Sequence, residues 1–214
     1  MEASLCYESR NDSCVRTIYP LPIRITLYMF LGATVTLTVC GNLLVSLSVA
    51  YFKQLHTPTN YLIVSLAISD LLLGLLVMLP SMIHCVETCW YFGGFFCKFY
   101  LSSDVTLCTA SILNLMFISL DRYYAVCHPL LYSQKISVNV VLIMIFLSWS
   151  VSSILGFGMI FLKLNLLGIE EFYLNKVACE GGCLLFQKKL YLVCRTCSSV
   201  SHTRCSCAHK KKTQ

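Results

Sequence analysis

Two acidic groups on one apolar segment are the residues best suited to chemistry in this chain. Asp104 lies within the segment, and Asp121 opens the run Asp121-Arg122-Tyr123, 17 positions later. At about 1.5 Å per helical residue, the two carboxylates would lie roughly 25 Å apart, which is most of a bilayer. An ionisable group inside hydrocarbon is costly and is by default a functional candidate. We therefore predict that Asp104 binds a cation from an outer pocket, whereas the triplet faces the cytoplasm.

The surroundings of Asp104 leave two interpretations open. Asp104 shares a helical face with Cys108 and Ser111, at spacings of four and seven residues. A buried carboxylate needs a proton, a cation or a polar partner. The ammonium group of a ligand would supply the cation, and a polar group on another helix is the alternative.

The other polar residues of the apolar segments also allow two interpretations. Asp121-Arg122-Tyr123 is either an interfacial ion pair, because arginine near a helix end reaches the interface readily, or a specific motif together with the following residues Tyr124 to Leu130. Asn42, Asp70 and Ser111 either supply oxygen ligands to a small cation such as Na⁺ or form a hydrogen-bond network between helices.

The composition is that of a membrane protein. The 214 residues are 57% hydrophobic and 12% charged, with a mean hydropathy of +0.73. Each of four stretches exceeds the roughly 20 residues that cross the hydrocarbon core. They are residues 23–50, 59–83, 97–120 and 138–162. We predict an all-α membrane protein with four transmembrane helices over residues 23–162, joined by short loops and surrounded by membrane lipid.

The segments outside the helices differ in character. Residues 1–22 are predicted to form an extracellular arm, with a glycosylation sequon at Asn11, and residues 163–187 the second extracellular loop. Residues 188–214 form a basic, cysteine-rich tail with seven Lys and Arg and no acid. Residues 1–187 contain 9 basic and 10 acidic residues, so the formal charge of +6 lies in the tail. Because the membrane part has no basic patch, we expect no nucleic-acid partner.

The cysteines indicate disulfides outside the membrane. Six of them fall in the expected outer segments, where an oxidising compartment favours disulfides; five are Cys6, Cys14, Cys97, Cys179 and Cys183, and the sixth is Cys85 or Cys89. Cys40, Cys108 and Cys127 are expected to stay thiols. The cysteine and histidine spacing of the tail matches no zinc pattern, so we expect no metal centre there. No nucleophile, base and orienting group converge in the sequence, so we do not expect an enzyme.

The order of these motifs resembles the rhodopsin-like G-protein-coupled receptors. The matching features are Gly41-Asn42, Leu66-Ala67-x-x-Asp70, Trp90-x-Phe92-Gly93, Cys97, Asp121-Arg122-Tyr123 and Trp149. Within that family, residues 52–60 and 89–93 resemble the trace amine-associated receptors. Residues 148–151, 157–162 and 181–183 resemble the first subtype. The four helices would correspond to the first four of a seven-helix bundle.

The resemblance implies roles for individual residues. Asp104 would bind the ammonium of a primary amine, with Val105 and Cys108 in the pocket and Leu185 approaching from the outer loop. Arg122 would be the hinge of G-protein activation, and signalling would run through the stimulatory G protein to cyclic AMP. Asp70 with Ser111 would form the sodium site. The implied disulfides are Cys97 with Cys183, Cys6 with Cys179 and Cys14 with Cys89.

One departure from the family limits these implications. Nothing after residue 187 resembles a fifth helix, so we expect a truncated form, incompetent in signalling, with a tail unlike the family. The alternative is an interaction protein, in which four helices pair with intact receptors and retain them. The family implies the plasma membrane, whereas a truncated chain would be retained in the endoplasmic reticulum.

Overall fold

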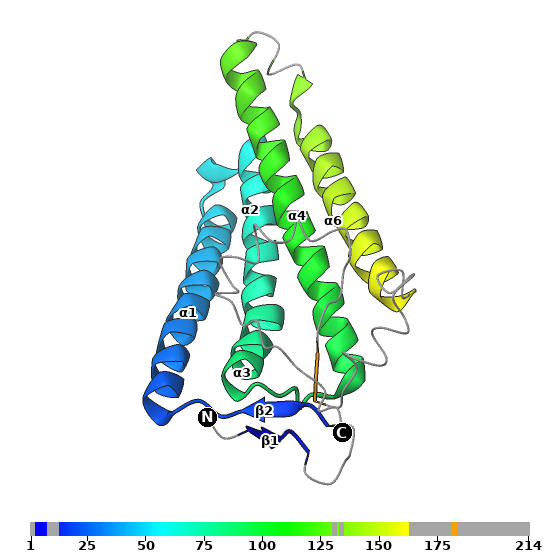
Figure 1. Cartoon of the computed structure of the whole chain (residues 1–214). Coiled ribbons are helices and arrows are strands. Elements are labelled where there is room, and N and C mark those ends of the chain that lie inside the picture. The colour runs from blue at the N-terminus through cyan, green and yellow to red at the C-terminus, as the bar shows by residue number, and fades with distance from the viewer. Residues whose placement is uncertain (1–2, 8–12, 130–131, 133–134, 163–180, 184–214) are drawn as a thin grey trace.

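The computed structural model describes residues 3–7, 13–129, 132, 135–162 and 181–183. Four long helical spans run side by side, and a small hairpin crosses their lower end in Figure 1. All four spans are long and apolar enough to cross a membrane, as the hydropathy pattern predicted. They are α1 (Leu21–Tyr51), α2 with α3 (Pro58–Glu87), α4 (Gly93–Cys127) and α6 (Val138–Phe161).

The second span is a composite of three pieces. α2 (Pro58–Leu72) passes into a single π-helical segment, η2 (Leu73–Met78), which continues as α3 (Leu79–Glu87). Pro80 lies in the first turn of α3. Proline lacks a backbone N–H, and a widened turn just before it accommodates the carbonyls that lose their donor. The span therefore continues past its proline to the end of the bundle where the N-terminal hairpin lies, which we call the outer end.

Local signals set the helix ends. Pro58 follows Thr57, whose hydroxyl accepts a hydrogen bond from the backbone N–H of Asn60 and so caps the start of α2. At the other end of that span, Thr88 adopts a left-handed conformation with φ of 60° and stops α3. A short 3₁₀ turn, η1 (Lys53–Leu55), fills the link between α1 and α2.

Small residues allow α4 and α6 to approach closely. Ser148, Ser152 and Gly156 recur every four residues on α6 and are buried. A Cβ added at Gly156 would lie 2.1 Å from Thr106 Oγ1 and 2.7 Å from the carbonyl oxygen of Ser102 on α4. Close backbone approach of this kind is how helices associate in lipid, where burial of apolar surface gives little driving force.

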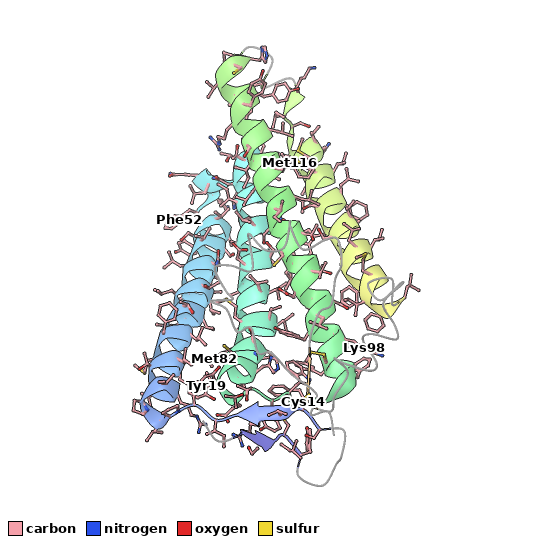
Figure 2. The ribbon with its side chains drawn as sticks, in the orientation of Figure 1. Cys14, Tyr19, Phe52, Met82, Lys98 and Met116 are labelled. Carbon is pink, nitrogen blue, oxygen red and sulfur yellow. A yellow bond between two sulfur atoms is a disulfide. The ribbon has the colours of Figure 1, made fainter. Side chains whose placement is uncertain are left out.

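The outer end of the bundle is covered by the N-terminal hairpin. Strands β1 (Ala3–Leu5) and β2 (Val15–Thr17) pair antiparallel, with Leu5 opposite Val15. The backbone N–H of Thr17 donates to Thr88 Oγ1 at 3.0 Å, and that hydroxyl donates back to the Thr17 carbonyl at 3.1 Å. Figure 2 shows the labelled Cys14, Tyr19, Met82 and Lys98 toward this end of the bundle, whereas Phe52 and Met116 lie toward the opposite end. The arm is thus attached to the end of the second span.

Candidate functional site

Three outer segments meet at Trp90, which is 3% exposed. The backbone N–H of Trp90 donates to the carbonyl of Gly181 at 2.7 Å, and the hydroxyl of Tyr7 donates to the Trp90 carbonyl at 3.4 Å. The indole ring packs on Tyr100 of α4, with ring centroids 5.0 Å apart, and belongs to a buried cluster with Val77, Tyr100, Leu107 and Cys183. The arm, the first outer link and residues 181–183 therefore form one cap over the start of α4.

Glu87 holds the arm to two helices. Its carboxylate forms an ion pair with Arg16 of β2 at 2.7 Å and a second one with Arg24 of α1. The hydroxyl of Tyr28 donates to the same carboxylate at 3.1 Å. Glu87 is 17% exposed, so these charge-assisted contacts lie partly out of solvent, where such contacts are stronger.

The structure forms the disulfide between Cys97 and Cys183, with Cα atoms 5.8 Å apart, and thereby ties α4 to the segment at residues 181–183. The other two expected pairings, Cys6 with Cys179 and Cys14 with Cys89, are both wrong, because Cys6 bonds Cys89. The N–H of Cys6 donates to the carbonyl of Cys14 at 2.9 Å, so both cysteines sit at the same end of the hairpin. Because Cys6 and Cys14 lie side by side, the resemblance to a family does not determine which of the two bonds Cys89. Cys14 is also disulfide-bonded.

Cys85 and Cys89, of which one was expected to be the sixth outer cysteine, are both disulfide-bonded. Cys40 and Cys127 are free thiols on exposed positions. Cys179 lies outside the described residues, as do Leu185 of the expected pocket and the sequon residue Asn11.

Asp104 lies on the face of α4 that it shares with Tyr100 and Cys108, one turn to either side. Its side chain is partly buried. The Cys108 thiol donates to Asp104 Oδ1 at 3.6 Å, and Cys108 is itself 6% exposed. Val105 is 3% exposed and, as the next residue of the helix, points about 100° away from Asp104. A partly buried carboxylate in surroundings of low polarity is stabilised in its charged form by a nearby cation.

Asp70 and Ser111 are brought together, as the polar pattern suggested. Ser111 Oγ donates to Asp70 Oδ1 at 2.8 Å, and the Ser69 and Ser111 hydroxyls lie 2.9 Å apart. Asn42 behaves differently, because its amide donates to the carbonyl of Thr38 on its own helix at 2.9 Å. The described hydrogen bonds thus link α2 with α4 through Asp70, while Asn42 is engaged within α1.

Asp121, Arg122 and Tyr123 lie near the inner end of α4, which continues to Cys127. Asp121 is 2% exposed, whereas Arg122 and Tyr123 are 59% and 55% exposed. Arg122 Nε is 3.6 Å from Asp121 Oδ2. Neighbouring residues of the triplet therefore differ sharply in environment.

Several residues of these sites carried no signal in the sequence. Thr59 and Tyr132 bind Asp121, from 62 residues before it and 11 after it. Glu87 pairs with Arg24 and Arg16, which precede it in the sequence by 63 and 71 residues. No periodic pattern connects such positions. Trp90 was part of a recognised motif, but its contacts to the arm and to Gly181 follow only from the fold.

Comparisons with known proteins agree with this architecture. A family model described as 7 transmembrane receptor (rhodopsin family) matches residues 41–203. Trace amine-associated receptor 1 of Macaca mulatta is 51% identical over 185 residues, covering 86% of this chain and 55% of the relative, and that of Homo sapiens is 50% identical over the same length. Trace amine-associated receptor 4 of Rattus norvegicus is 44% identical over 190 residues, with 89% and 54% covered. The chain spans about half the length of the curated relatives that it matches. With the family model matching well over half of its residues, the chain belongs to the rhodopsin family of seven-transmembrane receptors.

Proposed function

We propose that this chain supplies the amine-recognition part of a receptor for trace or biogenic amines, with Asp104 as the counter-ion of a primary ammonium group. The observation that carries the proposal is the position of Asp104, which lies on one face of α4 between Tyr100 and Cys108 and below the cap at Trp90. The relatives bear the name trace amine-associated receptor, which supports the same ligand class.

The chemistry suits a small amine better than a strongly hydrated ion. The Cys108 thiol donates to Asp104 Oδ1, and a carboxylate can accept several hydrogen bonds at once, including those of a charged donor. An ammonium group would supply up to three donors and offset the cost of a carboxylate kept from bulk water. Val105 and Leu185 would add apolar contacts to the ligand.

The inner end of α4 is the proposed coupling site. Arg122 is exposed there and would contact a heterotrimeric G protein, which we propose to be the stimulatory type. The pair Asp70 and Ser111, between the two ends, would hold a Na⁺ ion with Ser69 oxygen nearby. The chain is a membrane protein, and we propose the plasma membrane as its destination, with glycosylation at Asn11 on the outer side.

Amine binding tests the proposal directly. Because the relatives are longer, binding of labelled phenethylamine is measured for the chain alone and for the chain co-expressed with the remaining part of trace amine-associated receptor 1. Asp104→Asn keeps the shape of the side chain but removes its charge. A lost charge-assisted contact costs about 1.5 kcal/mol or more, so we expect affinity to fall at least about tenfold.

Ser119→Ala is the matched control. Ser119 is exposed on the same helix, and its hydroxyl donates to the carbonyl of Leu115 at 2.8 Å. This variant should bind as the unaltered chain does. An Asp104→Asn variant that kept its affinity within about threefold would refute the counter-ion role.

Pairing with an intact receptor is the second candidate function. Its support is the inner half of α4, where Leu115, Met116 and Val126 are 52%, 46% and 79% exposed. Such a face could pack against a helix of another receptor chain and retain it in the endoplasmic reticulum. Co-purification of a tagged trace amine-associated receptor 1 with this chain, together with loss of that receptor from the cell surface, would support this function. Normal surface delivery without co-purification would exclude it.

A further inference from the structure

The outer segments of the chain contain an odd number of cysteines. The seven are Cys6, Cys14, Cys85, Cys89, Cys97, Cys179 and Cys183. The three pairs that the family resemblance implies use six of them and leave out Cys85. Each disulfide uses two cysteines, so an odd number leaves one cysteine in every chain as a thiol or for a bond to another molecule. Adding the four cysteines of residues 188–214 keeps the number odd.

The hairpin places Cys6 and Cys14 opposite each other. In its register Leu5 faces Val15, so the next pair along is Cys6 with Cys14. The N–H of Cys6 donates to the Cys14 carbonyl at 2.9 Å, which agrees with this continuation. Opposite residues of an antiparallel pair carry their side chains on the same face, with Cβ atoms about 4.5–5.5 Å apart. The two sulfur atoms therefore belong to one face of the hairpin.

The second span presents two more cysteines at this end. Cys89, in the link between α3 and α4, bonds Cys6, with Cα atoms 5.8 Å apart. Cys85 lies on α3, about one helical turn before Cys89, and is also disulfide-bonded. Cys14 is disulfide-bonded as well, and both Cys14 and Cys89 are 1% exposed. Burial limits attack by thiols from solution, so exchange at these sulfur atoms is favoured between cysteines of the same chain.

We propose that the arm carries a disulfide-exchange switch, in which Cys89 bonds Cys6 in one form and Cys14 in a second form. The odd thiol of the outer set is the nucleophile. Its thiolate attacks the cysteine that bonds Cys14, and the Cys14 thiolate is released. The Cys14 thiolate then attacks Cys89, and Cys6 leaves as a thiolate that takes up a proton. Each step forms one S–S bond and breaks one, so the numbers of disulfides and thiols stay constant and no oxidant is consumed.

The two forms hold the arm at different points. Cys6 directly follows β1, whereas Cys14 directly precedes β2. The ion pair between Arg16 and Glu87 holds β2 in both forms. When the disulfide moves from Cys6 to Cys14, β1 loses the covalent bond that lies next to it. Exchange therefore loosens β1 and leaves β2 in place.

Peptide mapping of the whole 214-residue chain in nanodiscs measures the exchange. One sample is treated with N-ethylmaleimide at harvest, which caps thiols and so stops exchange. A second sample is first kept without oxygen at about pH 8, where a substantial share of thiols is ionised, and is then capped. Both are digested without reduction.

The sequence allows the two forms to be told apart. Cleavage after Arg10 separates Cys6 from Cys14, and cleavage after Glu87 isolates the two cysteines of the second span from each other. We expect the Cys6–Cys89 peptide to predominate in the sample capped at harvest. The Cys14–Cys89 peptide should rise at least about threefold in the incubated sample. Hydrogen exchange should become about two- to fivefold faster at Ala3–Leu5 after the shift, with exchange at Val15–Thr17 unchanged.

Matched variants identify the nucleophile. Cys85→Ser makes the outer number even, so it should lower the rate of exchange at least about tenfold and abolish capping in the outer segments. Cys127→Ser removes an exposed thiol at the inner end and should leave the rate unchanged. A variant with serine at the four cysteines of residues 188–214 should also exchange at the rate of the unaltered chain.

A Cys14–Cys89 peptide that did not increase on incubation would overturn the proposal. A shift that proceeded equally in Cys85→Ser, or in the chain capped before incubation, would also overturn it, because neither has the odd thiol. The same holds if most of the chain runs as a dimer on a gel without reductant, since the odd cysteine would then bond another chain. If Cys85→Ser does not fold, the comparison of capped with uncapped chain decides. The assay contains no amine, so its outcome is independent of the proposed function.

Discussion

The indole N–H of Trp149 donates a hydrogen bond to Ser65 Oγ at 3.0 Å and so joins α6 to α2. Ser65 is 5% exposed, which leaves its hydroxyl little access to water. α6 is held to α4 mainly by close backbone packing, so this bond is a specific link to a second helix. It fixes which face of α6 is turned toward the bundle.

Loss of this bond should weaken the bundle measurably. We expect Trp149→Phe to lower the free energy of unfolding in detergent by about 1 kcal/mol or more, because polar bonds between membrane helices contribute about 0.6–1.7 kcal/mol and the smaller ring also packs less well. Ser65→Ala removes the same bond with little change in packing. If Ser65→Ala unfolds at the same temperature as the unaltered chain, the hydrogen bond makes no net contribution to the free energy of unfolding.

Glycine to alanine changes should distinguish two glycines of α6. A Cβ at Gly156 would collide with Thr106 and Ser102, whereas nothing lies within 4 Å of a Cβ at Gly158. We expect Gly156→Ala to destabilise the chain by about 1–3 kcal/mol through overpacking. Gly158→Ala should be neutral or stabilising by up to about 1 kcal/mol, because alanine favours the helix. Thermal unfolding of both variants in one detergent checks this, and equal midpoints would contradict the packing at Gly156.

Neutralising Glu87 should release the N-terminal arm. Glu87→Gln removes the charge that Arg16 and Arg24 share, so the arm loses the ion pair that Arg16 of β2 makes with the second span. We expect faster hydrogen exchange at Val15–Thr17, with exchange in the middle of α4 unchanged. Because the carboxylate is partly exposed, raising the salt concentration from about 0.1 to 1 M should produce a weaker form of the same change. Arg16→Gln should release the arm to a similar extent while leaving the pair between Glu87 and Arg24 of α1 intact. If hydrogen exchange at Val15–Thr17 did not change in Glu87→Gln, the arm would be held by the Cys6–Cys89 disulfide and by the hydrogen bonds to Thr88 instead.

Among the linked peptides recovered without reduction, we expect one that joins Cys6 to Cys89 and one that joins Cys97 to Cys183. The first pair distinguishes the structure from the pairing implied by resemblance, in which Cys14 binds Cys89. A linked peptide that contains Cys14 and Cys89 would show that the hairpin presents its other cysteine to the first outer link.

Hydropathy predicted the four spans because a membrane helix must bury a fixed length of apolar residues. The predicted boundaries fall short where a helix leaves the hydrocarbon. The segment expected over residues 97–120 forms a helix over Gly93–Cys127, because a helix satisfies its backbone hydrogen bonds internally whether or not lipid surrounds it. The π-helical segment at Leu73–Met78 could not be predicted from hydropathy, because a π-helix differs from an α-helix in its hydrogen-bond spacing and not in its composition.

The candidate sites were only partly predictable. Asp104, Asp70 and Asp121 stand out because a carboxylate in an apolar segment is rare, and their positions can be read directly from the chain. Their partners cannot, because Thr59 and Tyr132 are ordinary hydroxyl residues that become partners only when α2 and the link pack against α4. Spacing along one helix predicts a shared face, but contacts between helices depend on how the helices cross.

The length of α4 has a mechanical consequence. Its 35 residues form a rod about 52 Å long, anchored outside by the bond from Cys97 to Cys183 and inside by the two hydroxyls on Asp121. A rod clamped at both ends resists sliding along its axis more than it resists a small twist. Side chains about 6 Å from the axis would sweep roughly 1 Å for a turn of about 10°. A rotation of α4 caused by a force at Asp104 would therefore move Ser111 and Arg122 at the same time, because the helix turns as one rigid body.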